Sequence, residues 1–151
     1  MVDIQTVSIV IASAGVFAAS IYYILQIRHQ NRMRQTDLVM KLYSQFSSLE
    51  FQKVWYKVLK REAKDYYDYE KKYGFAEYSA IDIFFEGIGI LLKRKLIGIE
   101  LVDDMFTTPV KWTWEKTKDI TLEWRKVRKA PEIGEWLEYL YNEMQKREQR
   151  K

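Results

Sequence analysis

The chain has 151 residues, a formal net charge of +4 and no cysteine. The absence of cysteine excludes disulfides, thiolate nucleophiles and cysteine-ligated metals. The single histidine, His29, excludes a His-rich metal site. The length suits one compact domain of about 100 to 150 residues beside one further segment.

The segment from Ile4 to Ile27 contains no charged residue and is followed directly by Arg28. A helix rises about 1.5 Å per residue and the hydrocarbon core of a bilayer is about 30 Å thick, so about 20 apolar residues span it. The sequence therefore predicts one transmembrane helix over residues 4–27. A cleaved secretory signal is the alternative, because Ala18-Ala19-Ser20 offers small residues, but the usual basic start is absent.

The basic residues Arg28, Arg32 and Arg34 follow the apolar segment, whereas the residues before it carry Asp3 and no Lys or Arg. Cytoplasmic flanks of membrane helices are enriched in basic residues. We therefore expect a single-pass protein of the cell membrane with its N-terminus outside and its C-terminal part in the cytoplasm. The same three arginines are candidate contacts to lipid headgroups.

Small residues recur at steps of four, three and four within the apolar segment, which places them on one helical face. This small-xxx-small pattern lets two helices approach closely in lipid. It indicates a contact with another helix, from a protein partner or a second copy of the chain, while a plain anchor is the alternative. The residues of this face are Ser8, Ala12, Gly15 and Ala19.

The helix of the anchor is predicted to continue through Phe46, because no Pro or Gly interrupts it and apolar side chains recur on one face. Ser47 and Glu50 form a capping-box pattern, which predicts a second helix from about Ser48 to Lys64. The segment 65–78 is dense in tyrosine and charge, and we expect it to extend that helix and then turn. Its tyrosines form a recognition surface or the edge of the core.

Ser79 is the expected N-cap of a third helix, whose long apolar stripe marks it as the most buried one. Gly87 and Gly89 within it predict close helix packing, because a phosphate-binding glycine loop would need a preceding strand. Asp82 is expected in the first turn, where the helix dipole stabilises a negative charge.

Gly98 is expected to end the third helix, and a short helix over about residues 99–106 follows. Thr108 and Pro109 then predict the start of a longer helix that runs to about Arg128. A last helix follows the Ala-Pro pair after it, and its apolar stripe is the cleanest in the sequence.

These elements predict an all-α fold in which one N-terminal transmembrane helix continues into a cytoplasmic helical bundle. No window shows the alternation of a half-buried strand together with hairpin turn residues. The expected organisation is a short extracytoplasmic terminus, a span, a cytoplasmic domain and a charged tail, at residues 1–3, 4–27, 28–145 and 146–151.

Four carboxylates are the candidates for chemistry: Asp82 and Glu86, which share a helical face, and the adjacent Asp103 and Asp104. Such groups act as general acids and bases or bind a divalent cation only where a pocket brings them together. The sequence contains no catalytic constellation or cofactor motif, so we expect a non-enzymatic protein with no cofactor and no evident small-molecule substrate. The alternative is a membrane-tethered enzyme or ligand-binding module that uses these carboxylates in a bundle cavity.

Basic clusters elsewhere in the chain suit a solvated surface, a lipid surface or nucleic acid. The one helix that is a candidate for binding nucleic acid also contains Glu115, Asp119 and Glu123, which reduce its positive charge. Attraction to anionic headgroups is favoured by an anchor that already holds the domain near the leaflet. We therefore expect membrane lipid and a protein partner or second copy, but no nucleic acid.

Four blocks of sequence, taken in order, resemble a known family. They are YYILQIRHQNRMRQTDLVMKLYSQF after the small-residue-rich span, FFEGIGILLKRKLIGIELVDDMF, a WEK helix and a closing EWLEYLYNEM. They are similar to a prokaryotic family of membrane-anchored helical proteins, domain of unknown function 4760. The resemblance covers nearly the whole chain and implies an anchor with a helical cytoplasmic domain, but no activity and no catalytic residues. We expect the domain to bind a partner or to serve as an accessory subunit of a membrane assembly.

Overall fold

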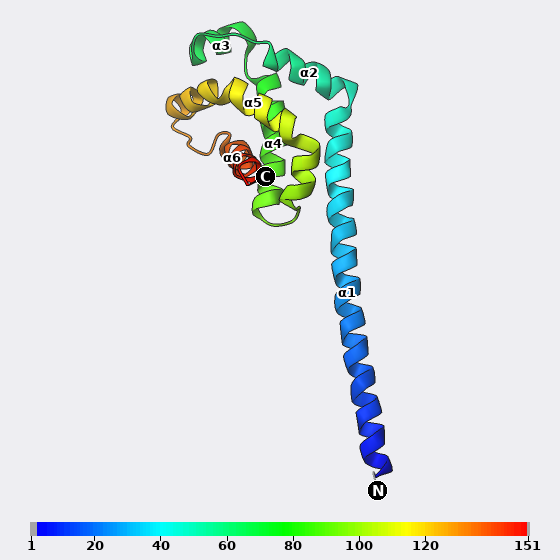
Figure 1. Cartoon of the computed structure of the whole chain (residues 1–151). Coiled ribbons are helices and arrows are strands. Elements are labelled where there is room, and N and C mark those ends of the chain that lie inside the picture. The colour runs from blue at the N-terminus through cyan, green and yellow to red at the C-terminus, as the bar shows by residue number, and fades with distance from the viewer. Residues whose placement is uncertain (1–2, 151) are drawn as a thin grey trace. The chain divides into compact units, whose positions relative to one another are not determined.

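The structure, a computed structural model, describes residues 3–150 and contains within them six helices and no strand (Figure 1). This confirms the all-α prediction. The chain divides into two units with the boundary between Asp37 and Leu38. Helix α1, Ile4–Ser47, contributes to both units, and helices α2 to α6 belong to the second.

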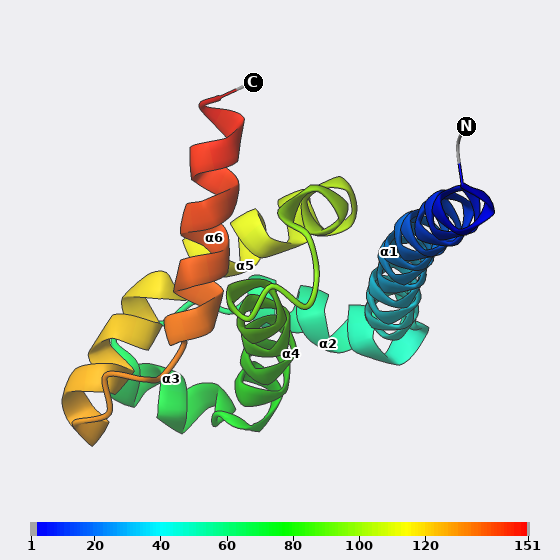
Figure 2. The same ribbon diagram turned by 90° about the horizontal axis from the view of Figure 1, so that it is seen from below.

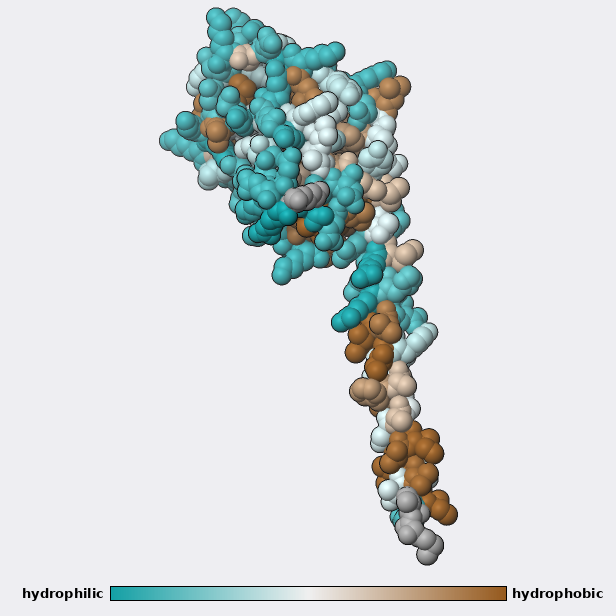
Figure 3. Space-filling model, in the orientation of Figure 1, coloured by the Kyte–Doolittle hydropathy of each residue, from teal (hydrophilic) through white to brown (hydrophobic). Residues whose placement is uncertain are grey.

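Helix α1 contains the apolar segment, and among residues 3–150 it is the one helix long and apolar enough to cross a membrane. Every side chain over residues 3–34 is exposed. The hydroxyls of Ser8 and Ser20 donate to the carbonyl oxygens of Ile4 and Val16, at 2.9 and 2.8 Å. Figure 3 shows apolar residues along the N-terminal part of α1 and a mainly hydrophilic visible surface on the second unit.

Helix α2, Leu49–Leu59, has Ser48 rather than Ser47 as its N-cap. The Ser48 hydroxyl accepts a hydrogen bond from the N–H of Phe51 at 3.3 Å, which satisfies one of the amides left without a partner at a helix start. The helix ends before the predicted Lys64, and an irregular connection follows it.

Helix α3, Tyr66–Tyr73, is separate from α2, so the tyrosine-rich segment does not extend the second helix. Asp65 is its N-cap, and Gly74 ends it with a φ of +64°. Glycine adopts this left-handed φ without the steric cost that a Cβ imposes. Tyr66 and Tyr69 are buried, so this part of the segment belongs to the edge of the core.

Helix α4, Ala76–Lys93, begins before Ser79, so the predicted cap is wrong. Its N-cap residue, Phe75, makes no side-chain cap hydrogen bond. Tyr78 is only 2 % exposed, and packing of the first turn against the core takes the place of a polar cap. Because the helix starts early, Asp82 lies beyond its first turn, and the helix dipole does not account for that carboxylate.

Helix α5, Ile99–Arg128, continues through Pro109, where a break was predicted. An interior proline lacks a donor and usually costs about 3 kcal/mol. Here Phe106 and Val110 are fully buried on either side of it, so core packing holds the helix together. Its ribbon bends along its length (Figure 2). Gly98 is the N-cap of α5 and does not end the preceding helix.

Helix α6, Glu135–Glu148, begins after a short irregular connection. Lys129 adopts a left-handed φ of +53° at the end of α5, and Gly134 adopts a φ of +66° just before α6. A Cβ on Gly134 would lie 2.7 Å from Cγ2 of Thr121. Both the backbone angle and the space therefore require glycine at this position.

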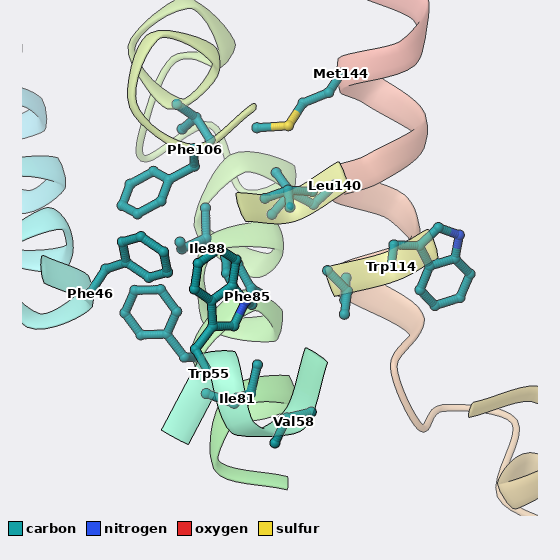
Figure 4. Close-up of a cluster of buried hydrophobic side chains, with 14 of the residues drawn as sticks. Phe46, Trp55, Val58, Ile81, Phe85, Ile88, Phe106, Trp114, Leu140 and Met144 are labelled. Atoms are coloured by element: carbon teal, nitrogen blue, oxygen red, sulfur yellow. The ribbon is translucent and has the colours of Figure 1, made fainter. Parts of the chain in front are cut away.

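Aromatic rings dominate the core of the second unit. The ring of Phe46 has centroid distances of 5.2 Å to Trp55, 6.0 Å to Phe84 and Phe85, and 5.8 Å to Phe106. The labelled rings among these point toward one another in Figure 4. The last turns of α1 are thereby joined to α2, α4 and α5 through one apolar cluster.

Helices α4 and α6 pack side by side (Figure 2), and their backbones lie close together at Gly89. A Cβ on Gly89 would lie 2.2 Å from the carbonyl oxygen of Trp136 and 2.8 Å from its carbonyl carbon. A Cβ on Gly87 would meet nothing within 4 Å. The prediction of close helix packing is therefore confirmed for Gly89 and wrong for Gly87.

We predict opposite effects for alanine at these two glycines. Gly89→Ala forces the backbones of α4 and α6 apart, so it lowers the free energy of unfolding by about 3 kcal/mol. Gly87→Ala adds a better helix former in open space and raises it by up to about 1 kcal/mol. Urea unfolding of the full chain in detergent, followed by tryptophan fluorescence, measures both, and equal effects would contradict the packing described.

Candidate functional site

The small residues of the apolar segment lie exposed along α1. Ser8, Ala12, Gly15 and Ala19 are all accessible, and a Cβ on Gly15 would meet nothing within 4 Å. The face is open to a second helix, and the contact itself stays a prediction.

The three arginines after the apolar segment are exposed on α1. Arg28, Arg32 and Arg34 begin the polar part of the helix directly after its apolar residues. This position suits headgroup contact if the segment spans a membrane, and that contact also stays a prediction.

Glu86 caps α6 from another helix. Its Oε1 accepts hydrogen bonds from the backbone N–H groups of Trp136 and Leu137, at 2.6 and 3.0 Å. Gly134, the N-cap residue of α6, has no side chain to do this. A carboxylate at a helix start satisfies free amides and is stabilised by the helix dipole, so Glu86 holds the beginning of α6 on α4.

Asp103 and Asp104 do not form one site. Asp103 is buried, and its carboxylate accepts from Nε of Arg147 at 2.9 Å and from the hydroxyl of Thr107 at 2.5 Å. Asp104 is exposed. Within residues 3–150 no three acidic or histidine side chains are placed to hold a metal ion together.

Asp82 lies near Arg125, whose side chain is partly buried. Arg125 donates from Nε to the carbonyl oxygen of Ile133 and from Nη1 to Glu138, both at 2.7 Å. Its Nη2 and Oδ1 of Asp82 are buried without a hydrogen-bond partner among the described residues, and both lie beside Gly134. We call this region the α6 junction; its residues are Asp82, Glu86, Arg125, Gly134 and Glu138.

Burial and, to a lesser extent, the nearby Glu86 carboxylate together raise the pKa of Asp82 to about 7, while Arg125 partly opposes both. Burial also raises the pKa of Glu86, against the two backbone hydrogen bonds that it accepts. The space beside Asp82 is too narrow for a water molecule. The junction can therefore take up a proton near neutral pH, but it offers no room for a substrate.

Sequence reasoning selected Asp82 and Glu86 by their spacing and missed Arg125, Glu138 and Gly134. These three come from α5, α6 and the connection between them, and only the turn of the chain brings them to α4. The one sequence feature that pointed to this region was Gly134 soon after Pro131, and it predicts a turn rather than an interaction with Asp82 or Glu86.

An exposed surface of mixed basic and apolar character lies on α2. Leu49 is 69 % exposed and Tyr56 47 % exposed, and three lysines surround them. Trp112 of α5 is also exposed, and it stacks at 6.2 Å on Trp55 of α2. We call this the α2 surface; it consists of Leu49, Gln52, Lys53, Tyr56, Lys57 and Lys60.

These features define an all-helical protein with one candidate membrane span. Residues 9–144 match DUF4760, a domain of unknown function, and the chain belongs to this family. No curated protein and no solved structure matches the chain. The family carries no established activity, so no functional residues are transferred from it.

We predict that Asp82→Asn changes how stability depends on pH. With a folded pKa of about 7 against an ordinary value of 3.8, Asp82 binds a proton in the folded state but not in the unfolded state between these values. Stability from this group is therefore greatest at low pH and falls, by a few kcal/mol at most, as the pH rises from about 4 to about 7.

Asparagine keeps the shape without the charge, so the gain in stability of Asp82→Asn over the parent is largest at pH 8, shrinks as the pH falls and is smallest near pH 4. Urea unfolding of the full chain in detergent across this range measures the difference. Asp104→Asn, which replaces an exposed carboxylate, is the matched control, and its difference in stability from the parent should not change over this pH range. A parent and an Asp82→Asn variant with parallel curves would contradict a proton on Asp82.

Proposed function

We propose that the protein is a single-span membrane protein whose helical domain docks an acidic surface of a partner protein, as an accessory subunit of a membrane assembly. The observation that carries the docking proposal is the α2 surface. Aromatic residues are enriched in protein interfaces, and exposed Tyr56 and Leu49 lie there among lysines. None of its six residues is acidic, so an acidic partner is complementary in charge to Lys53 and Lys60, while Lys57 pairs with Glu77 at 2.8 Å.

The span is supported by the length and exposure of α1. Residues 4–27 correspond to about 36 Å of helix, enough for a hydrocarbon core of about 30 Å. The serine hydroxyls of Ser8 and Ser20 bond within the helix, so they carry no unsatisfied donor into lipid. The arginines that follow favour an outside N-terminus and a cytoplasmic domain.

We predict opposite accessibility at the two ends of α1. The chain has no cysteine, so Gln5→Cys and Gln45→Cys each carry a single thiol at an exposed position. A membrane-impermeant maleimide should label the first in intact cells and the second only after lysis. The reverse pattern overturns the orientation, and release of the protein by alkaline carbonate without detergent overturns the span.

We predict that a photo-crosslinking amino acid at Tyr56 captures a partner protein in native membranes through an acidic segment, identified by mass spectrometry. Lys53→Glu should abolish the adduct because it places a like charge against that segment. Lys71→Glu, an exposed lysine on α3 away from the α2 surface, is the matched control and keeps it.

A basic substitution in the acidic segment of the partner should restore the adduct that Lys53→Glu abolishes. Adducts to lipid alone, no adduct, or an adduct that Lys53→Glu leaves intact would each overturn docking at α2.

Gly15→Leu, compared with Ala14→Leu on a different face of α1, reports separately whether the small-residue face contributes to the assembly.

A second candidate function uses the α6 junction. A buried carboxylate with a pKa near neutrality is typical of functional sites as well as of structural ion networks, which favours a membrane-tethered enzyme or ligand-binding module, although the space beside Asp82 would have to widen to admit a ligand. The partners of Glu86 and Asp103 within the protein favour a structural role for both. If the probe at Tyr56 captures no partner, while a small molecule raises the unfolding temperature of the parent but not of a normally folded Asp82→Asn variant, this second candidate replaces the first.

A further inference from the structure

A cleft of about 390 Å³ opens between α5 and the connection from α2 to α3. This volume falls within the range of small-molecule pockets, about 300–1,000 Å³. The cleft shares no residue with the α2 surface or the α6 junction. We call it the Arg61 cleft; its charged lining consists of Arg61, Glu62 and Lys64 from the connection and Lys116, Asp119 and Glu123 from α5.

Arg61 is a buried cation, only 7 % exposed. Nη1 donates to the hydroxyl of Tyr69 at 3.1 Å, Nη2 pairs with Glu77, and the guanidinium carbon lies 4.9 Å from the ring centre of Tyr73. Its Nε–H is buried and has no acceptor among the described residues. A buried donor without an acceptor is unfavourable, and because Arg61 lines the cleft, a ligand oxygen that reaches this N–H would satisfy it.

The wall that contains Arg61 is held in place by several hydrogen bonds. The carbonyl oxygen of Glu62 accepts from the hydroxyl of Tyr73 at 3.2 Å and from Nζ of Lys72 at 3.5 Å. The N–H of Lys64 donates to Oδ2 of Asp68 at 3.0 Å. A wall ordered before binding loses little entropy when a ligand arrives.

The lining of the cleft holds three cations and three carboxylates, and Glu77 outside the lining also pairs with Arg61. The absence of an excess of cations disfavours a polyanion such as a nucleotide, and the presence of both signs suits a ligand that carries both. Asp119 is exposed on α5, whereas one oxygen of Glu123 already accepts from the N–H of Tyr66 at 2.5 Å. An ammonium group therefore fits at Asp119 and a carboxylate at Arg61 and Lys116.

We propose that the Arg61 cleft binds a small zwitterion with one carboxylate and one ammonium group, of which an α-amino acid is the simplest example. The carboxylate accepts from Arg61 and Lys116, and the ammonium group donates to Asp119. This goes beyond the partner docking proposed for the α2 surface, and it adds a small-molecule ligand where the sequence made no small-molecule substrate evident.

Isothermal titration calorimetry of the full chain in detergent tests the proposal with a panel of the standard L-amino acids. Acetate and methylammonium are the single-charge probes. At least one amino acid should bind with one-site saturation, and both single-charge probes should bind about tenfold more weakly because each loses a charge-assisted contact. No binding across the panel, or acetate binding as tightly as the amino acid, overturns the proposal.

Exposed residues of the cleft provide variants that leave the buried Arg61 in place. Lys116→Gln and Asp119→Asn should each raise Kd about tenfold, and Lys118→Gln, exposed on the same helix outside the cleft, should leave it unchanged. Thermal unfolding by circular dichroism checks that all three fold. Unchanged Kd in the first two variants, or an equal loss with Lys118→Gln, overturns the site.

Discussion

The helical domain depends on the contact between α4 and α6. At Gly89 the backbones approach so closely that no side chain fits between them. This proximity lets Glu86, on the preceding turn of α4, reach the first amides of α6. In return α6 places Leu137 and Leu140, both almost fully buried, into the core. Apolar packing and the satisfaction of polar groups therefore occur at the same place.

A row of threonines gives α5 a defined rotation in the core. Thr113, Thr117 and Thr121 each donate to the carbonyl oxygen four residues earlier, at 2.7 to 2.9 Å. Two of these hydroxyls also bond buried aromatic residues. Nε1 of Trp55 donates to Thr113 at 2.8 Å, and the hydroxyl of Tyr78 pairs with Thr121. A rotated α5 would leave these polar groups buried and unpaired, so the row specifies one arrangement.

The all-helical fold and the long first helix followed from apolar periodicity, which is a local property of the sequence. The helix start predicted at Ser79 and the helix break predicted at Pro109 were wrong, because burial of neighbouring side chains outweighs the conformational preference of a single residue. The spacing of Asp82 and Glu86 placed them on one face. Their environment could not be predicted, since Arg125 reaches them only through tertiary packing.

The capping of α6 by Glu86 has a consequence for the order of folding. The carboxylate and the amides that it caps are 50 residues apart in sequence. A helix of 14 residues is about the length at which an isolated helix is marginal in water. The start of α6 is therefore stabilised only after the intervening chain has closed, a non-local step that raises contact order and slows folding. The last helix of the chain thereby becomes ordered together with the middle of the domain.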